Sequence, residues 1–281
     1  MANPAQVNFI RYLRRDGMDK FIEDVERMAE ALLRKYGESS LRTIDHLRRR
    51  LIELHELNKV KINHSIMELV LGAYLSDKGY RVEVEYPLNG DLVADLAAWK
   101  SGKLMIIEVE TGFTSPENAL DPQSYLTARI VSKMARYGSY AERFSLATPL
   151  HNILQIPRIL LDSRSRSDEA LLTLKKLCDR YYSTPAIDLE KLSKIKLYRI
   201  YLINVDTQAV KPLRPKTYLE RMKGLLPSLN DIKNYLGAGI RSSVAYGRAP
   251  SRSFSKGVHA PQPYHAPGLG CRRSGAREPD A

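Results

Sequence analysis

The stretch Tyr80–Glu110, YRVEVEYPLNGDLVADLAAWKSGKLMIIEVE, decides the fold that we expect for this chain. Apolar and polar residues alternate over Tyr80–Tyr86, which predicts a half-buried strand. A turn at Asn89–Gly90 leads into a second strand, Leu92–Trp99, and a tight hairpin joins that strand to a third, Leu104–Glu110. The third strand is rich in apolar residues, so we expect it to lie in the centre of a sheet.

Helical patterns lie on both sides of these three strands. Ile62–Lys78 predicts a helix that ends at Gly79. Asp121–Pro122 predicts the start of another helix, which runs to about Tyr140, and Phe144–Thr148 predicts a short strand. The order helix, three strands, helix, strand predicts an α/β fold.

The first sixty residues are expected to be helical. Apolar residues recur at helical spacing from Phe21 to Leu33. A second seam steps by three and four residues through Ile44, Leu47, Leu51 and Leu54. We favour a helical hairpin that packs within the chain, with a homodimer contact as the alternative.

The C-terminal half is predicted to extend the same domain. Glu169–Tyr182 predicts an amphipathic helix, Leu197–Val205 a buried strand, and Lys216–Tyr235 two short helices separated at Pro227. Gly237–Ala281 contains seven glycines and five prolines without apolar periodicity, which predicts a disordered basic tail. The expected organisation is a helical region (1–60), a core (61–150), a C-terminal α/β extension of the same domain (151–236) and the tail (237–281).

Composition and charge limit the classes of function that the chain can have. The 281 residues include 44 Lys and Arg against 32 Asp and Glu, a net charge of +12 that favours a polyanionic partner. The two cysteines, Cys178 and Cys271, form no CxxC pair, which excludes a cysteine zinc site and a disulfide framework and fits a reducing compartment. With no signal peptide and no apolar run of ~18 residues, we expect a cytoplasmic protein with no membrane partner.

Three carboxylates are expected to meet on the hairpin. Glu108 and Glu110 lie two apart on one strand, so they point to the same face, and the hairpin brings Asp95 opposite them. A buried carboxylate is costly unless it is paired or bound to a metal. Three of them together predict a site for a hard divalent cation, Mg²⁺ or Mn²⁺. Such an ion can activate water and stabilise the charge that develops on a phosphodiester, which suits a basic protein that binds nucleic acid.

This pattern resembles the PD-(D/E)xK nuclease superfamily, which includes restriction endonucleases, Holliday-junction resolvases and RecB-like repair nucleases. The resemblance covers about residues 62–148 and rests on the element order and on Asp95, twelve residues, then Glu108–Val109–Glu110. It implies a restriction-endonuclease-like core and a magnesium-dependent endodeoxyribonuclease that hydrolyses phosphodiester bonds of duplex or branched DNA. It also implies that Asp95, Glu108 and the Val109 carbonyl bind the metal, with Glu68 as a supporting acid on the preceding helix.

The chain departs from the family pattern at one position. Glu110 stands where the family has the lysine that positions the attacking water. Glu110 could replace that lysine as a third metal ligand or a general base, or Lys133 could supply the charge from the following helix. We favour Glu110, because its place in a strand fixes its direction. The alternative function is a catalytically inactive nuclease-fold protein that binds DNA or serves in an assembly.

Each candidate residue has an ordinary structural alternative. Glu108 and Glu110 could be the exposed face of an edge strand. Glu68 could complete a capping box with Ser65, and His64, one turn before Glu68, could join it or be an exposed helix-terminal residue. A stripe on the helix after the hairpin could contact phosphates or could simply face solvent; it comprises Arg129, Lys133, Arg136 and Tyr140.

Overall fold

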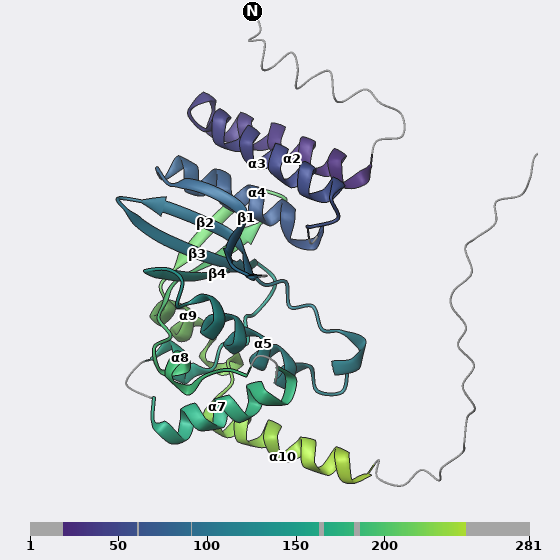
Figure 1. Ribbon diagram of the computed structural model, residues 1–281, viewed down its shortest axis with the longest axis vertical. Helices are drawn as coiled ribbons and strands as arrows, with labels where there is room; N and C mark the ends of the chain where they lie inside the picture. The colour runs from purple at the N-terminus through teal and green to yellow at the C-terminus, as the bar shows by residue number, and fades with distance from the viewer. Residues whose placement is uncertain (1–18, 61, 91, 163–165, 183–185, 246–281) are drawn as a thin grey trace, which may run out of the picture.

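A mixed six-stranded sheet forms the centre of the protein (Figure 1). The computed structural model describes residues 19–60, 62–90, 92–162, 166–182 and 186–245. The strands follow one another in chain order across the sheet: β1 (Arg81–Asn89), β2 (Leu92–Lys100), β3 (Lys103–Val109), β4 (Arg143–Pro149), β5 (Leu197–Asn204) and β6 (Ala209–Leu213). The pairs β3–β4 and β4–β5 are parallel, and the other three pairs are antiparallel. The prediction of an α/β fold is therefore confirmed.

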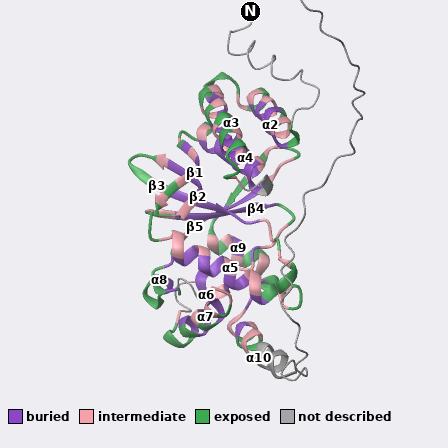
Figure 2. Ribbon diagram, turned by 45° about the vertical axis from the view of Figure 1, so that its right-hand side comes forward, coloured by how far each residue is buried: buried purple, intermediate pink, exposed green. Residues whose placement is uncertain are grey.

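Helices cover both faces of the sheet (Figure 1). One face carries α2 (Lys20–Tyr36), α3 (Leu41–Glu56) and α4 (Ile62–Asp77). The other side carries α5 (Pro122–Tyr137), α6 (Arg158–Leu161), α7 (Asp168–Tyr181), α8 (Leu189–Ser193), α9 (Pro215–Met222) and α10 (Leu229–Ala245). The short 3₁₀ helices are η1 (Glu38–Ser40), η2 (Pro116–Asn118) and η4 (Lys223–Leu225). Each face has its own apolar core, and the buried residues concentrate in and beside the sheet (Figure 2).

Strand β3 connects the two cores. It lies between β2 and β4, and its adjacent residues Ile106 and Ile107 point to opposite faces. Ile106 packs in the core under α5, and Ile107 packs in the core under α4. The expectation that this strand is central is confirmed, and the alternative of an exposed edge strand for Glu108 and Glu110 is wrong.

The N-terminal helices pack within the chain. The seam residues Ile44, Leu47, Leu51 and Leu54 are all buried, and α3 contacts both α2 and α4. Asp19 caps α2 by accepting a hydrogen bond from the backbone N–H of Phe21. The predicted helical hairpin is confirmed, and its seam is not free for the alternative, a dimer contact.

Some element boundaries differ from the sequence-based prediction. β1 continues through Pro87 to Asn89, and the strand β6 was not predicted. Helix α10 continues to Ala245, nine residues into the predicted tail that begins at Gly237, while residues 246–281 of that tail lie outside the described residues. Among the described residues, no helix combines the length and the apolar character that crossing a membrane would require.

Candidate functional site

The candidate site lies where β2 and β3 separate. Their regular pairing ends at Leu96 and Ile107, so Asp95 and Glu108 are the next residues opposite each other. Beyond that point, side chains take over the hydrogen bonds of the ladder. The backbone N–H of Asp95 donates to Glu108 Oε1 at 3.2 Å, and the N–H of Val109 donates to Asp95 Oδ2 at 2.6 Å. These bonds satisfy two backbone N–H groups that would otherwise have no partner where the strands separate. They also fix the orientation of both carboxylates.

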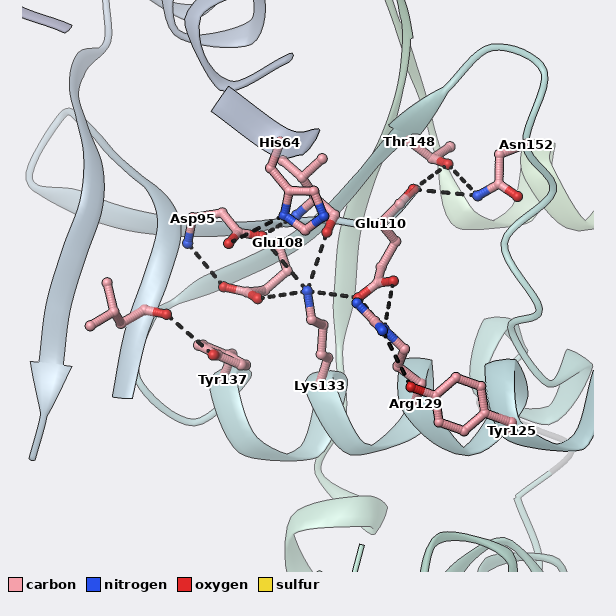
Figure 3. Close-up of polar contacts among 12 residues, drawn as sticks. His64, Asp95, Glu108, Glu110, Tyr125, Arg129, Lys133, Tyr137, Thr148 and Asn152 are labelled. Atoms are coloured by element: carbon pink, nitrogen blue, oxygen red, sulfur yellow. Dashed lines mark hydrogen bonds and ion pairs between the residues drawn. The ribbon is translucent and has the colours of Figure 1, made fainter. Parts of the chain in front are cut away.

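Lys133 reaches into this opening from α5 (Figure 3). Its Nζ lies 2.7 Å from Glu110 Oε1, 3.1 Å from Glu108 Oε2 and 3.7 Å from Asp95 Oδ2. It also donates to the carbonyl oxygen of Val109 at 3.2 Å. Asp95, Glu108 and Glu110, which we call the carboxylate cluster, therefore converge on one ammonium group.

Arg129 is the second cation at the carboxylate cluster. Its Nε lies 3.0 Å from Glu110 Oε2, and Nη1 donates to the hydroxyl of Tyr125 at 3.4 Å. Glu110 thus holds both Arg129 and Lys133, one helical turn apart on α5 (Figure 3). Three carboxylates share two cations in this cluster.

Burial sets the acid–base properties of the cluster, because all three carboxylates are at most 2% exposed. Burial alone would raise the pKa of Asp95, but the charge of Lys133, the neighbouring His64 and the backbone N–H of Val109 together outweigh it, so this pKa lies below its usual range. Burial and the charge of Asp95 raise the pKa of Glu108 to about 8. Burial would lower the pKa of Lys133, yet the three carboxylates raise it above its usual value. Lys133 is therefore a permanent cation here.

Two residues of helix α4, together with Asp95, form a group of possible metal ligands. His64, Glu68 and Asp95 are buried, and each offers an atom that lies within 4.8 Å of the other two. Nδ1 of His64 has no hydrogen-bond partner among the described residues and lies 3.9 Å from Asp95 Oδ1. One imidazole and two carboxylates are a donor set that suits a divalent cation such as Mn²⁺. Within the described part of the chain, this is the group with metal-ligand spacing.

The predicted acids are placed as follows. Asp95, Glu108 and Glu110 converge, although Lys133 lies among them, and Asp95 alone of the three belongs to the group with metal-ligand spacing. Glu68 belongs to that group as well. Since α4 begins at Ile62, Ser65 lies inside the helix, so the capping-box alternative is wrong.

His64 differs from its expectation. The sequence favours an exposed residue near the helix end, but the imidazole is buried. Spacing does provide a signal for its role, because residues four apart on a helix share a face, and His64 is four residues before Glu68. The helix must then begin before His64, as it does.

The stripe on α5 divides into two parts. Arg129 and Lys133 point into the carboxylate cluster, so the interpretation as a solvent-facing stripe is wrong for them. Arg136 instead lies over the ring of Tyr182, 5.5 Å from its centroid, and Tyr140 is exposed. Nucleic-acid binding by Arg129, Lys133 and Arg136 stays a prediction.

The sequence gives little sign of the residues that support the site from β4 and the loop after it. The Thr148 hydroxyl donates to the carbonyl oxygen of Glu110 at 2.8 Å, and Asn152 Nδ2 donates to the same oxygen at 3.3 Å. Gly112 has φ +78°, and a Cβ there would lie 2.5 Å from Asn152 Oδ1. The positive φ favours glycine at this position, and any other residue would also displace the amide of Asn152. Together these contacts fix the backbone on which Glu110 is carried.

Comparisons with known proteins identify no relative from which a function could be inferred, so the interpretation rests on the geometry of the site. No protein-family model, curated protein or solved structure gives a significant match to the chain.

Proposed function

We propose that the protein is a metal-dependent nuclease that hydrolyses DNA phosphodiester bonds, with a restriction-endonuclease-like core formed by α4, β1–β3, α5 and β4. One observation carries the proposal: His64, Glu68 and Asp95 form a group with metal-ligand spacing beside the ammonium of Lys133. The opened strands β2 and β3 present both features at one place. The net charge of +12 favours a polyanionic substrate.

The residues present fit a divalent ion. His64 Nδ1 is buried without a hydrogen-bond partner among the described residues, and it lies near the Asp95 carboxylate. An ion held by His64, Glu68 and Asp95 would lower the pKa of a water bound to it and neutralise charge developing on the phosphodiester. Glu108 would support this arrangement because its carboxylate accepts a hydrogen bond from the backbone N–H of Asp95.

Lys133 is the best candidate for the role of the family's lysine. Its ammonium lies 3.1 Å from Glu108 and 3.7 Å from Asp95, so a water or phosphate oxygen beside these acids would be within its reach. The carboxylate of Glu110 already contacts Lys133 and Arg129. These contacts favour Glu110 as a positioning residue that holds the two cations, and they weigh against a role as general base.

Single-turnover cleavage tests the proposal and separates the two roles. The substrates are linear duplex, single-stranded and branched DNAs, each with Mg²⁺ and with Mn²⁺. We expect cleavage by the wild type and a loss of about 100-fold or more in Asp95→Asn and in Lys133→Ala at saturating DNA, as for loss of a group that acts in the transition state. Glu110→Gln should lose less, because Lys133 keeps its contacts with Asp95 and Glu108.

Glu83→Gln is the matched control, since Glu83 is an acidic strand residue that pairs with His46 outside the site. It should cleave like the wild type. A larger loss in Glu110→Gln than in Lys133→Ala would assign the role to Glu110. Absence of cleavage by the wild type on every DNA with both metals would contradict the proposal and favour the inactive DNA-binding alternative.

A further inference from the structure

We propose that the ammonium of Lys133 fills a second cation position, so that the wild-type protein binds one divalent ion and binds two only when Lys133 is replaced. This inference rests on the proposed function for the first position, the one made by His64, Glu68 and Asp95. The second position is the space that Lys133 Nζ now occupies between β2, β3 and α5 (Figure 3).

The ammonium of Lys133 is surrounded by oxygen atoms of the kind that bind divalent cations. Four oxygens lie 2.7–3.7 Å from it, three from the carboxylate cluster and one from the Val109 carbonyl. Carboxylate and carbonyl oxygens are the ligands that hard divalent cations prefer, at roughly 2.0–2.6 Å. The same oxygens cannot surround an ammonium and a divalent ion together, so the presence of Lys133 excludes an ion from this position.

The second step is the orientation of Asp95, which faces both positions. Oδ1 is directed toward His64 at 3.9 Å, while Oδ2 lies 3.7 Å from Lys133 Nζ and accepts the backbone N–H of Val109. In two-metal sites, a pair of cations stands about 3.5–4 Å apart. A carboxylate with one oxygen toward each position is suited to join two cations, and here one of the two is the lysine.

The third step is the fixed placement of Lys133. Its side chain is 14% exposed, and its ammonium lies within 3.7 Å of all three carboxylates and donates to the Val109 carbonyl. The ammonium is therefore held at this position by contacts on several sides. Arg129, by contrast, contacts only Glu110 among the three carboxylates and does not occupy a position surrounded by four oxygens.

Calorimetric titration of Mn²⁺ tests the inference by the number of ions bound. We expect one ion in the wild type, none in His64→Ala, two in Lys133→Met and one in the double variant His64→Ala/Lys133→Met. Arg129→Met is the matched control, because it removes a cation of the same cluster and should still bind one ion. Electron paramagnetic resonance adds a second measurement: two Mn²⁺ ions joined by Asp95 in Lys133→Met should give an exchange-coupled spectrum, which the wild type lacks.

The outcomes separate this inference from the proposed function. If the wild type binds no ion but Lys133→Met binds one, the first site fails and the second cation position stands. If Lys133→Met binds the same number of ions as the wild type, the inference is overturned, whatever the nuclease assays show. Should Lys133→Met be unfolded in EDTA, the inference requires Mn²⁺ to restore a cooperative melting transition, and failure to restore it would overturn the inference as well.

Discussion

Two clusters of charged side chains in this protein differ in the balance of acids and cations. In the N-terminal ionic cluster, Arg48 pairs with Glu26 and with Asp45, and Arg49 also pairs with Asp45. Two acids there face two arginines. In the carboxylate cluster, Asp95, Glu108 and Glu110 share Lys133 and Arg129, so three acids face two cations.

The difference separates a structural ion cluster from a candidate binding site. In the N-terminal ionic cluster each acid has an arginine partner, although burial raises the pKa of Glu26 there as well. The carboxylate cluster has one acid in excess, and the metal-free protein accommodates this by the raised pKa of Glu108, which burial and Asp95 bring to about 8. Asp95 of this cluster lies 3.9 Å from Nδ1 of His64, which has no hydrogen-bond partner among the described residues. In the carboxylate cluster, an excess of acids therefore coincides with a neighbouring imidazole and with metal-ligand spacing.

The largest effect is expected where the balanced cluster is broken. Arg48→Met leaves Glu26, which is fully buried, without its cation. Removing one partner of a buried pair costs about 3–5 kcal/mol, so the free energy of unfolding should fall by that amount in urea titrations. Arg27→Met is the control, because Arg27 is exposed and pairs with Glu23 at 3.5 Å, and it should change stability by less than about 1 kcal/mol.

The destabilisation expected in Arg48→Met comes only from the unpaired charge of Glu26 and does not involve the candidate metal site. The loss in Arg48→Met should be the same with and without Mn²⁺, since Arg48 is not part of the candidate metal site. A loss that Mn²⁺ reverses would mean that the two clusters are coupled and would contradict the comparison.

A second effect, a dependence of stability on pH, is expected from the excess acid. The pKa of Glu108 is raised in the fold, so the native state keeps a proton that the unfolded state has lost. The stability that this proton provides is complete below the unfolded pKa, near 4.5, and is lost as the pH rises through about 8. In EDTA, wild-type stability should therefore fall between pH 5 and pH 8, and Glu108→Gln should remove most of that fall.

Thermal melts at several pH values measure this slope. Glu83→Gln, on β1, provides the control and should keep the wild-type slope. An unchanged slope in Glu108→Gln would show that Glu108 does not carry the excess proton.

Most of the fold follows from local patterns in the sequence. Alternation and helical spacing predict β1 to β5 and α2 to α5, because each of these elements has one face or both in an apolar core. Strand β6, Ala209–Leu213, is five residues long and contains Pro212, so it lacks a readable period. The helices α6 and α8 have four and five residues, which is too short for an amphipathic pattern.

The candidate site is predictable only in part. Strand parity places Glu108 and Glu110 on one face and the hairpin places Asp95 opposite, so this meeting follows from local geometry. The direction of Lys133 depends on how α5 crosses the sheet, and the burial of His64 depends on where α4 begins. Thr148 and Asn152 act through the backbone carbonyl of Glu110, and contacts to a carbonyl leave no sequence pattern.

The smallest effect, and the sharpest test of the comparison, is the response of stability to Mn²⁺. At ten times the dissociation constant, one bound ion should stabilise the wild type by about 1.4 kcal/mol, a rise of roughly 3–6 °C in Tm. Arg48→Met should be stabilised by the same amount, because the substituted residue belongs to the N-terminal ionic cluster and not to the candidate metal site. His64→Ala should gain nothing, since it removes the imidazole ligand from the group with Glu68 and Asp95. Equal gains in all three proteins would place the ion elsewhere and would end the distinction between a balanced cluster and a metal-binding one.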